Sequence, residues 1–157
     1  MYSMNNFDEL HPRTGAGRFT DKRGSSPETA LPPAPQAVQF HETQREARGH
    51  DFYPPDFATW PAVNAHNDTP MNELPLYGHY FIGDTHFYVS EVDQDTSEAF
   101  VYTDYGHGIE GGFGYLSMAD MEALAVPTDQ GPQPLHRDEY FVPGTLTSQV
   151  IDKYAAR

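Results

Sequence analysis

The stretch of sequence that decides the fold is YGHYFIGDTHFYVSE, which covers residues 77–91. Aromatic and β-branched residues fill both of its halves, 77–82 and 85–91, and this composition is typical of β-strands. The halves are separated by Gly83-Asp84, a short loop with glycine in first place, as a type II′ turn requires. The sequence therefore predicts an antiparallel β-hairpin.

The turn also sets the register of this hairpin. Ile82 is expected opposite Thr85, and His79 opposite Tyr88. Since side chains alternate between the two sides of a strand, one face should contain His79, Phe81, His86, Tyr88 and Ser90, and the other Tyr80, Ile82, Phe87, Val89 and Glu91. The second face is the more apolar, so we expect it to meet the core.

Further strands are expected C-terminal to the hairpin. Residues 98–104 form the third strand after a polar loop, and 113–116 form a short fourth strand after the glycine-rich turn at 106–112. A final strand is predicted at 138–142, just before a Pro-Gly pair. The expected sheet is thus an antiparallel β-meander of four to five strands.

One helix is predicted between the last two of these strands. Ser117 is placed to be its N-cap with Asp120 at the third helical position, and Leu116 and Met121 are spaced for a hydrophobic staple. Its apolar stripe is expected to consist of Met118, Met121, Leu124 and Ala125, with Pro127 ending the helix. A small antiparallel sheet with one packed helix is an α+β fold.

Composition divides the chain into three regions. Residues 1–50 are rich in glycine and proline and poor in large apolar residues, so we expect a disordered arm with at most a marginal helix over 36–48. Residues 51–73 form an aromatic and proline-rich linker, and the folded domain is expected to span 74–157. The aromatic residues of the linker are expected to cover apolar surface of the domain, although a linear motif read by another protein is the alternative.

Charge is distributed unevenly along the chain. Residues 1–69 have a net charge of −3, whereas residues 70–152 contain fourteen acidic residues and one basic residue, Arg137, for a net charge of −13. Such a domain repels phosphate backbones, so direct binding of nucleic acid by this half is not expected. The field favours a basic or DNA-binding protein, or a metal cation, although excess carboxylates also keep a small domain soluble.

Several classes of protein are not favoured by this sequence. The chain has no cysteine, which excludes disulfides and thiolate zinc sites. We find no secretory signal and no apolar run of the ~20 residues that a membrane span needs. Its glycine-rich run at 106–114 lacks the lysine of a phosphate-binding loop. The expectation is a cytoplasmic protein without a cofactor and without a membrane partner, whose oligomeric state is open.

Three motifs occur in a fixed order across residues 76–150. They are Tyr88-Val89-Ser90-Glu91; Gly114-Tyr115-Leu116-Ser117 followed by Asp120-Met121-Glu122; and Leu135-His136-Arg137-Asp138-Glu139-Tyr140-Phe141 followed by Pro143. In order and spacing they resemble domain-of-unknown-function family 2958, small proteins of bacterial plasmids, integrative elements and phages. The family usually has Glu-Trp where Gly112-Phe113 stands here, and a glycine where Val101 stands. The resemblance implies a mobile-element context in a bacterial host and implies no reaction.

The candidate binding residues are Arg137, Asp138, Tyr88, Glu91, Glu110 and Tyr115. Arg137 is the most suggestive because it is the only cation between residues 70 and 152. Its structural interpretation is a bidentate clamp to Glu91 or Glu110, and its functional interpretation is an anchor for an anion or a partner. Neighbouring acids would satisfy a lone guanidinium first, which favours the clamp.

A metal site is the alternative that the hairpin suggests. His79 and His86 fall on one face in the expected register, with Tyr88 beside them, and imidazole nitrogen is a common metal ligand. A third ligand would have to come from His107 or Glu110. Two histidines on one sheet face are also explained by simple exposure or by packing under the aromatic segment.

Two functional hypotheses follow from these features. The first is a non-catalytic protein-interaction module of a phage or mobile element, and its sharper version is an acidic DNA mimic that inhibits a host factor. The second is a small metal-dependent enzyme that uses the His79 and His86 face of the hairpin.

Overall fold

A computed structural model of the chain describes residues 40–154. The disordered arm expected over residues 1–50 therefore lies outside the described residues as far as residue 39.

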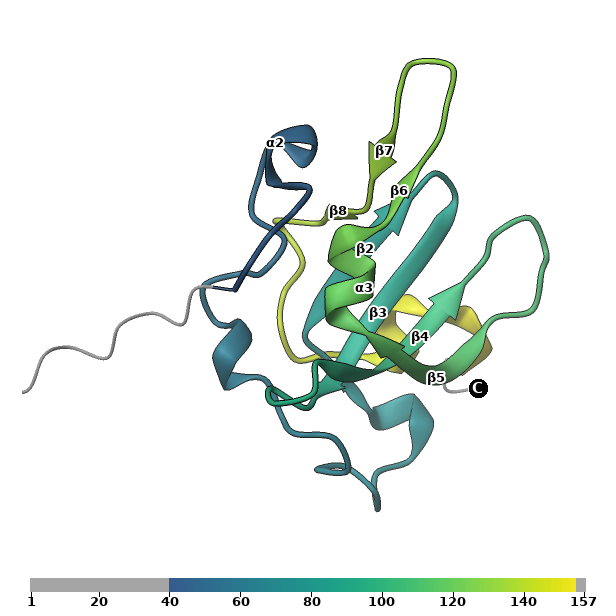
Figure 1. The fold of residues 1–157 in the computed structure, drawn as a ribbon. Helices are drawn as coiled ribbons and strands as arrows, with labels where there is room; N and C mark the ends of the chain where they lie inside the picture. The colour runs from purple at the N-terminus through teal and green to yellow at the C-terminus, as the bar shows by residue number, and fades with distance from the viewer. Residues whose placement is uncertain (1–39, 155–157) are drawn as a thin grey trace, which may run out of the picture. The chain divides into compact units, whose positions relative to one another are not determined.

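The centre of the fold is a five-stranded antiparallel sheet with the order β5-β4-β3-β2-β8 (Figure 1). Its strands are β2 (Gly78–Ile82), β3 (Thr85–Val92), β4 (Glu98–Asp104), β5 (Gly112–Ser117) and β8 (His136–Arg137). The first four follow one another as a meander, and β8 returns beside β2. The predicted α+β fold with an antiparallel meander is confirmed.

The hairpin of β2 and β3 has the register that its turn predicts. Ile82 pairs with Thr85 and His79 with Tyr88, and Gly83 adopts a φ of 58°, in the left-handed region that favours glycine. The predicted position of Glu91 is wrong, however. A β-bulge at Ser90 shifts the register so that Glu91 pairs with Phe100, which places it on the face opposite Val89.

The apolar face of the sheet, which contains Tyr80 and Val89, is covered by α3 (Met118–Ala123) and by residues from the linker. Figure 1 shows α3 crossing this face. The Ser117 hydroxyl accepts a hydrogen bond from the Asp120 amide at 3.1 Å, which confirms the predicted N-cap. The buried core here consists of Phe52, Phe57, Trp60, Tyr80, Val89, Val92, Ala99, Val101, Met118, Met121 and Leu135.

Helix α3 ends at Ala123, earlier than the predicted stop at Pro127. The chain turns into β6 (Ala125–Val126), which pairs with β7 (Gln133–Pro134). Leu124 is consequently 39% exposed and does not belong to the apolar stripe as predicted. Glu122, which no pattern marked as internal, is buried instead.

The opposite face of the sheet, which contains Tyr88 and Tyr102, is covered by the C-terminal part of the chain. There β1 (Pro75–Leu76) pairs with β9 (Thr145–Leu146), followed by α4 (Thr147–Val150) and η4 (Asp152–Tyr154). Leu76, Tyr102 and Ile151 form a second, smaller buried cluster. The Thr147 hydroxyl donates to the carbonyl of Leu74 at 2.8 Å and fixes α4 to the start of the domain.

The last strand was predicted at 138–142, and this prediction is wrong. Strand β8 occupies His136–Arg137, and the following residues form a turn. The Asp138 carboxylate accepts the amide of Tyr140 at 3.0 Å, and the Asp138 carbonyl accepts that of Phe141 at 3.3 Å. Aspartate forms such local bonds in competition with a strand ladder, and the chain therefore turns here.

Three short helical turns precede the sheet: α2 (Arg45–Arg48) lies before the linker, and η2 (Phe57–Thr59) and η3 (Met71–Glu73) lie within it. Of the marginal helix predicted over 36–48, only α2 is present among the described residues. Phe52, Phe57 and Trp60 are buried in the first core cluster, so residues 52–60 cover apolar surface of the sheet. Burial of an aromatic ring contributes roughly 1.5–3 kcal/mol, which explains why this proline-rich stretch adheres to the domain.

Two arginines join residues 48–51 to residues 135–137, and each segment supplies one of them. Arg48 Nε donates to the carbonyl of Leu135 at 2.7 Å, and Arg137 Nε donates to the carbonyl of Asp51 at 2.8 Å. This pair of contacts, the reciprocal arginine clasp, connects residues 48–51 to residues 135–137 at the β8 edge of the sheet. The opposite edge, β5, has no strand beside it within residues 40–154.

No helix within residues 40–154 is long and apolar enough to cross a membrane.

Candidate functional site

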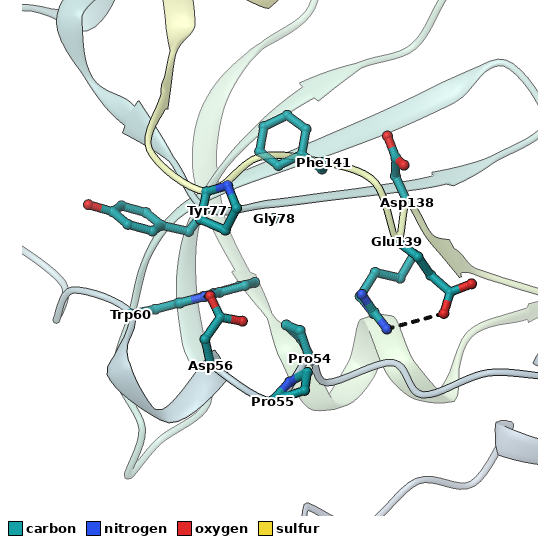
Figure 2. Close-up of a pocket in the computed structure, with 11 residues that line it drawn as sticks. Pro54, Pro55, Asp56, Trp60, Tyr77, Gly78, Asp138, Glu139 and Phe141 are labelled. Atoms are coloured by element: carbon teal, nitrogen blue, oxygen red, sulfur yellow. Dashed lines mark hydrogen bonds and ion pairs between the residues drawn. The ribbon is translucent and has the colours of Figure 1, made fainter.

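A groove of about 190 Å³ lies where the linker meets the turn after β8 (Figure 2). One wall comes from residues 54–60 and the other from residues 137–143. Its floor is formed by Tyr77 and Gly78 at the start of β2. The two walls are about eighty residues apart in sequence, so the groove exists only in the folded chain.

The floor of the groove depends on the absence of a side chain at Gly78. A Cβ at this position would lie 2.4 Å from Cη2 of Trp60, closer than atoms can approach without displacement. The indole ring therefore packs directly against the backbone of β2. Its Nε1 donates to Oδ2 of Asp56 at 3.2 Å, and this bond holds the carboxylate at the groove.

The walls combine rigid apolar surface with charge. Figure 2 shows the rings of Pro54 and Pro55 on one side and that of Phe141 on the other, with Tyr77 and Trp60 between them. Proline and aromatic rings have little conformational freedom to lose when a ligand contacts them. The groove is thus a preformed apolar surface on which a few charged groups are placed.

Four charged side chains line the groove. Asp56, Asp138 and Glu139 are acidic and Arg137 is basic, so the lining has a formal net charge of −2. Arg137 Nη2 lies 3.7 Å from Oε1 of Glu139, while its Nε is bonded to the Asp51 carbonyl. The clamp predicted from Arg137 to Glu91 or Glu110 is therefore wrong, because the guanidinium is held by the linker backbone.

Behind the groove, three titratable side chains form a hydrogen-bonded chain. Asp138 Oδ2 lies 3.0 Å from Nδ1 of His79, and Nε2 of His79 lies 2.9 Å from Nδ1 of His86. The His79 ring stacks on Tyr88 with centroids 4.5 Å apart and planes inclined by 5°. Phe141 from the groove wall lies 5.8 Å from the same ring, so the groove and the histidine chain share one turn of the backbone.

The protonation of this chain follows from its geometry. An ionised Asp138 can only accept, so Nδ1 of His79 donates to it and a neutral His79 must accept at Nε2 from His86. Burial lowers the pKa of His79, although its bond to Asp138 acts in the opposite direction. Burial alone would raise the pKa of Asp138, but bonds from His79 and from the Tyr140 amide outweigh it and lower that pKa. The neutral histidine beside a carboxylate is thus the favoured state.

These bonds bear directly on the metal hypothesis. Both ring nitrogens of His79 already have hydrogen-bond partners, so neither is free to coordinate an ion. Of the suggested third ligands, His107 pairs with Asp84 at 2.7 Å and Glu110 with Lys153 at 3.0 Å. Within the part of the chain that the structure describes, no group of three His, Cys, Asp or Glu side chains is arranged to hold a metal.

The structure brings some of the candidate residues together and separates others. Arg137 and Asp138 line the groove, and Tyr88 joins them through its stack on His79. Glu91 is buried elsewhere and accepts the amides of Asn64 and His66 at 2.7 and 2.8 Å.

The last two candidates, Glu110 and Tyr115, also lie apart from the groove. Glu110 forms the ion pair with Lys153, at the C-terminal end of the described chain. Tyr115 is 54% exposed on β5, where its ring lies 5.1 Å from that of Phe100.

Of the residues that line the groove, sequence reasoning named only Arg137 and Asp138 as candidates, and it missed Asp56, Trp60, Glu139 and Phe141 among the others. The aromatic and proline-rich composition of 51–62 was the available signal, but it predicted only that the segment would cover the domain. This segment forms one wall of a groove only because the turn after β8 forms the other. That turn was interpreted as a strand.

No family model matches the chain, and no curated protein or solved structure matches it. The resemblance to family 2958 therefore stays a prediction.

Proposed function

We propose that this protein is a non-catalytic interaction module that binds a basic partner protein. The observation that supports this best is the state of its cations. Residues 40–154 contain nineteen acidic and four basic residues, a net charge of −15. Each of the four basic side chains is engaged within the described chain: Arg45 with Asp51, Arg48 with Glu122, Arg137 with the Asp51 carbonyl and Lys153 with Glu110.

Uncompensated carboxylates give the domain a strongly negative field. Such a field repels nucleic acid and accelerates the approach of a basic surface, with a rate that falls as salt is added. The size of the groove agrees with this role. At about 190 Å³ it is smaller than the ~300–1,000 Å³ typical of small-molecule sites, and it fits a side chain of a partner protein better than a whole cofactor.

The biological setting belongs to the same proposal. The resemblance to family 2958 supports a phage or mobile-element protein that acts in the cytoplasm of a bacterial host. In the sharper version, the acidic surface imitates DNA and inhibits a host nuclease or regulator. The net charge of −15 supports this version, because a DNA mimic must present many carboxylates without neighbouring cations.

Capture from a bacterial lysate tests the proposal. The full chain is immobilised, nucleic acid in the lysate is digested, and bound proteins are eluted by a salt gradient or by duplex DNA. Recovery of a DNA-binding protein that duplex DNA releases supports the mimic. Release by salt but not by DNA supports a basic partner of another kind. Recovery of no basic protein contradicts the proposal.

The rival function, a metal-dependent enzyme, has one observation in its favour. In the neutral chain of hydrogen bonds, Nε2 of His86 is left without a proton and could act as a base or as a single ligand. Elemental analysis of the purified chain, combined with melting curves with and without added zinc, separates the two classes. Stoichiometric metal and a raised melting temperature would favour the enzyme.

A further inference from the structure

We propose that the groove is a binding site for one cationic side chain, arginine or lysine, presented by an extended segment of the partner protein. This inference rests on the proposed function, since it names the contact through which a basic partner would be recognised. It is argued from the carboxylates, the rings and the volume of the groove (Figure 2).

Two carboxylates on opposite walls have unused hydrogen-bonding capacity. Asp56 accepts the Trp60 indole through Oδ2, and within residues 40–154 its Oδ1 has no hydrogen-bond donor. Glu139 is 53% exposed, and its nearest cation is Arg137 at 3.7 Å, beyond hydrogen-bond range. A guanidinium or ammonium group in the groove would accordingly find an acceptor at Asp56, with the exposed Glu139 carboxylate at the rim.

Aromatic rings provide the second part of the site. Tyr77 and Phe141 are half-buried at the groove, and Trp60 lies beneath it. A cation within about 6 Å of such a ring gains roughly 0.5–2 kcal/mol from the electrons of its face. Rings also contact the aliphatic part of an arginine or lysine side chain, which a purely acidic surface cannot do.

Arg137 does not prevent a cation from binding here. Its side chain is only 13% exposed, and its Nε is directed to the Asp51 carbonyl behind the wall. Three carboxylates outnumber it in the lining. A carboxylate ligand attracted by Arg137 would lie among the same three carboxylates, and for this reason the charge of the groove favours a cation over an anion.

The volume and the rigidity of the groove limit what can enter it. About 190 Å³ accommodates one long side chain and excludes a folded element. Pro54 and Pro55 fix one wall, and the bonds within the turn at Asp138 fix the other. The groups that line the groove then lose little conformational freedom on binding, which allows a single weak contact to be specific.

The chain contains its own reporter for a test. Trp60 is the only tryptophan of the sequence, and its indole is bonded to Asp56. The probes are blocked pentapeptides, acetyl-Gly-Ala-Xaa-Ala-Gly-amide, in which Xaa is arginine, lysine, citrulline or glutamate. Citrulline retains the shape of arginine but has no charge. We expect a saturable change of Trp60 emission with arginine and lysine, at least about tenfold weaker binding of citrulline, and no response to glutamate.

A double variant with a matched control locates the site. Asp56→Asn with Glu139→Gln removes two charges from the groove, and asparagine can still accept from Trp60. Asp95→Asn with Glu98→Gln removes two exposed charges from the β3–β4 loop and the start of β4. We expect the first pair to weaken binding of the arginine peptide about tenfold, and the second pair to change it less than twofold.

The outcomes separate this inference from the proposed function. Equal binding of citrulline and arginine, preference for glutamate, an equal loss in both double variants, or no change of Trp60 emission with any peptide would each overturn the groove as a cation site. If any of these occurs while the full chain still captures a basic protein that salt releases, only the groove is rejected. Loss of that capture as well rejects the interaction module itself.

Discussion

The two arginines of the reciprocal clasp connect the same two segments and differ in how completely they are satisfied. The side chain of Arg48 is 0% exposed, and its guanidinium reaches the Leu135 carbonyl, the Glu122 carbonyl and carboxylate, and Glu42 at distances of 2.7–3.2 Å. Within residues 40–154, Arg137 has one hydrogen bond, to the Asp51 carbonyl, and a long contact to Glu139.

This difference separates a structural contact from a surface that is free to bind. A buried charge is tolerated only when hydrogen bonds replace its water, and the surroundings of Arg48 supply them. At the groove, Asp56 and Glu139 retain acceptors without a donor in the described chain, and water can reach them. Nothing in the fold requires those acceptors to stay unpaired, so a partner can use them.

Removal of the Arg48 side chain should have the largest effect on the free energy of unfolding. Arg48→Ala leaves the buried Glu122 without its cation, and we expect the free energy of unfolding to fall by about 3–5 kcal/mol. Arg45→Ala is the control, because its pair with Asp51 is exposed and should contribute less than about 1 kcal/mol. Urea denaturation measures both. Similar losses in the two variants would show that burial does not distinguish the contacts.

A methyl group in the floor of the groove should lower the free energy of unfolding by less than the loss of Arg48 does. Gly78→Ala places a methyl group against Trp60, and overpacking of this kind costs about 1–3 kcal/mol. We also expect the emission spectrum of the folded protein to change, because the indole must move. Gly114→Ala on β5 is the matched control, since no atom beyond the neighbouring residues of the chain lies within 4 Å of the added carbon. An unchanged stability and spectrum for Gly78→Ala would mean that the floor is deformable.

Arg137→Ala should have a smaller effect again. The variant loses one hydrogen bond to a backbone carbonyl, for which we expect about 1 kcal/mol by urea denaturation. Lys153→Ala, which removes an exposed ion pair, serves for comparison and should be close to neutral. If Arg137→Ala is as stable as the wild type, Arg137 has no structural role. Binding would then remain as the reason for its position.

The smallest expected effect is a pH dependence that arises behind the groove. Since burial holds the folded-state pKa of His79 below its ordinary value, the unfolded chain binds more protons between the two values. Stability from this group is therefore complete above about pH 6.5 and is lost as the pH falls through the folded-state pKa. His136, whose pKa burial also lowers, acts in the same direction.

Urea denaturation between pH 5 and pH 8 measures this slope. His79→Gln should reduce it without abolishing it, because His136 remains. The groups that face His79 are Asp138, His86, Tyr88 and Phe141, and bonds from His79 and the Tyr140 amide hold the pKa of Asp138 below its ordinary value. A slope that is unchanged in His79→Gln would show that the hydrogen-bonded chain does not control the dependence.

How far the sequence predicts this fold depends on the range of the forces involved. The hairpin register, the strand at 98–104 and the N-cap at Ser117 follow from turn geometry, alternation and capping, all of which act over a few residues. The strand expected at 138–142 was wrong because a single aspartate side chain bonds its own backbone there. The bulge at Ser90 escaped prediction because it is stabilised by a hydrogen bond to the distant Pro75 carbonyl.

The sequence by itself determined the antiparallel meander, the start of the helix and the excess of acidic charge. Each of these depends only on neighbouring residues or on composition. Only the tertiary structure decided the partners of the charges. It buried Arg48 with Glu122, seventy-four residues away, and brought Asp56 and Glu139 to the lining of one groove. Contacts between distant segments decide which charges are neutralised and which stay available to a partner. Those contacts exist only once the chain has folded.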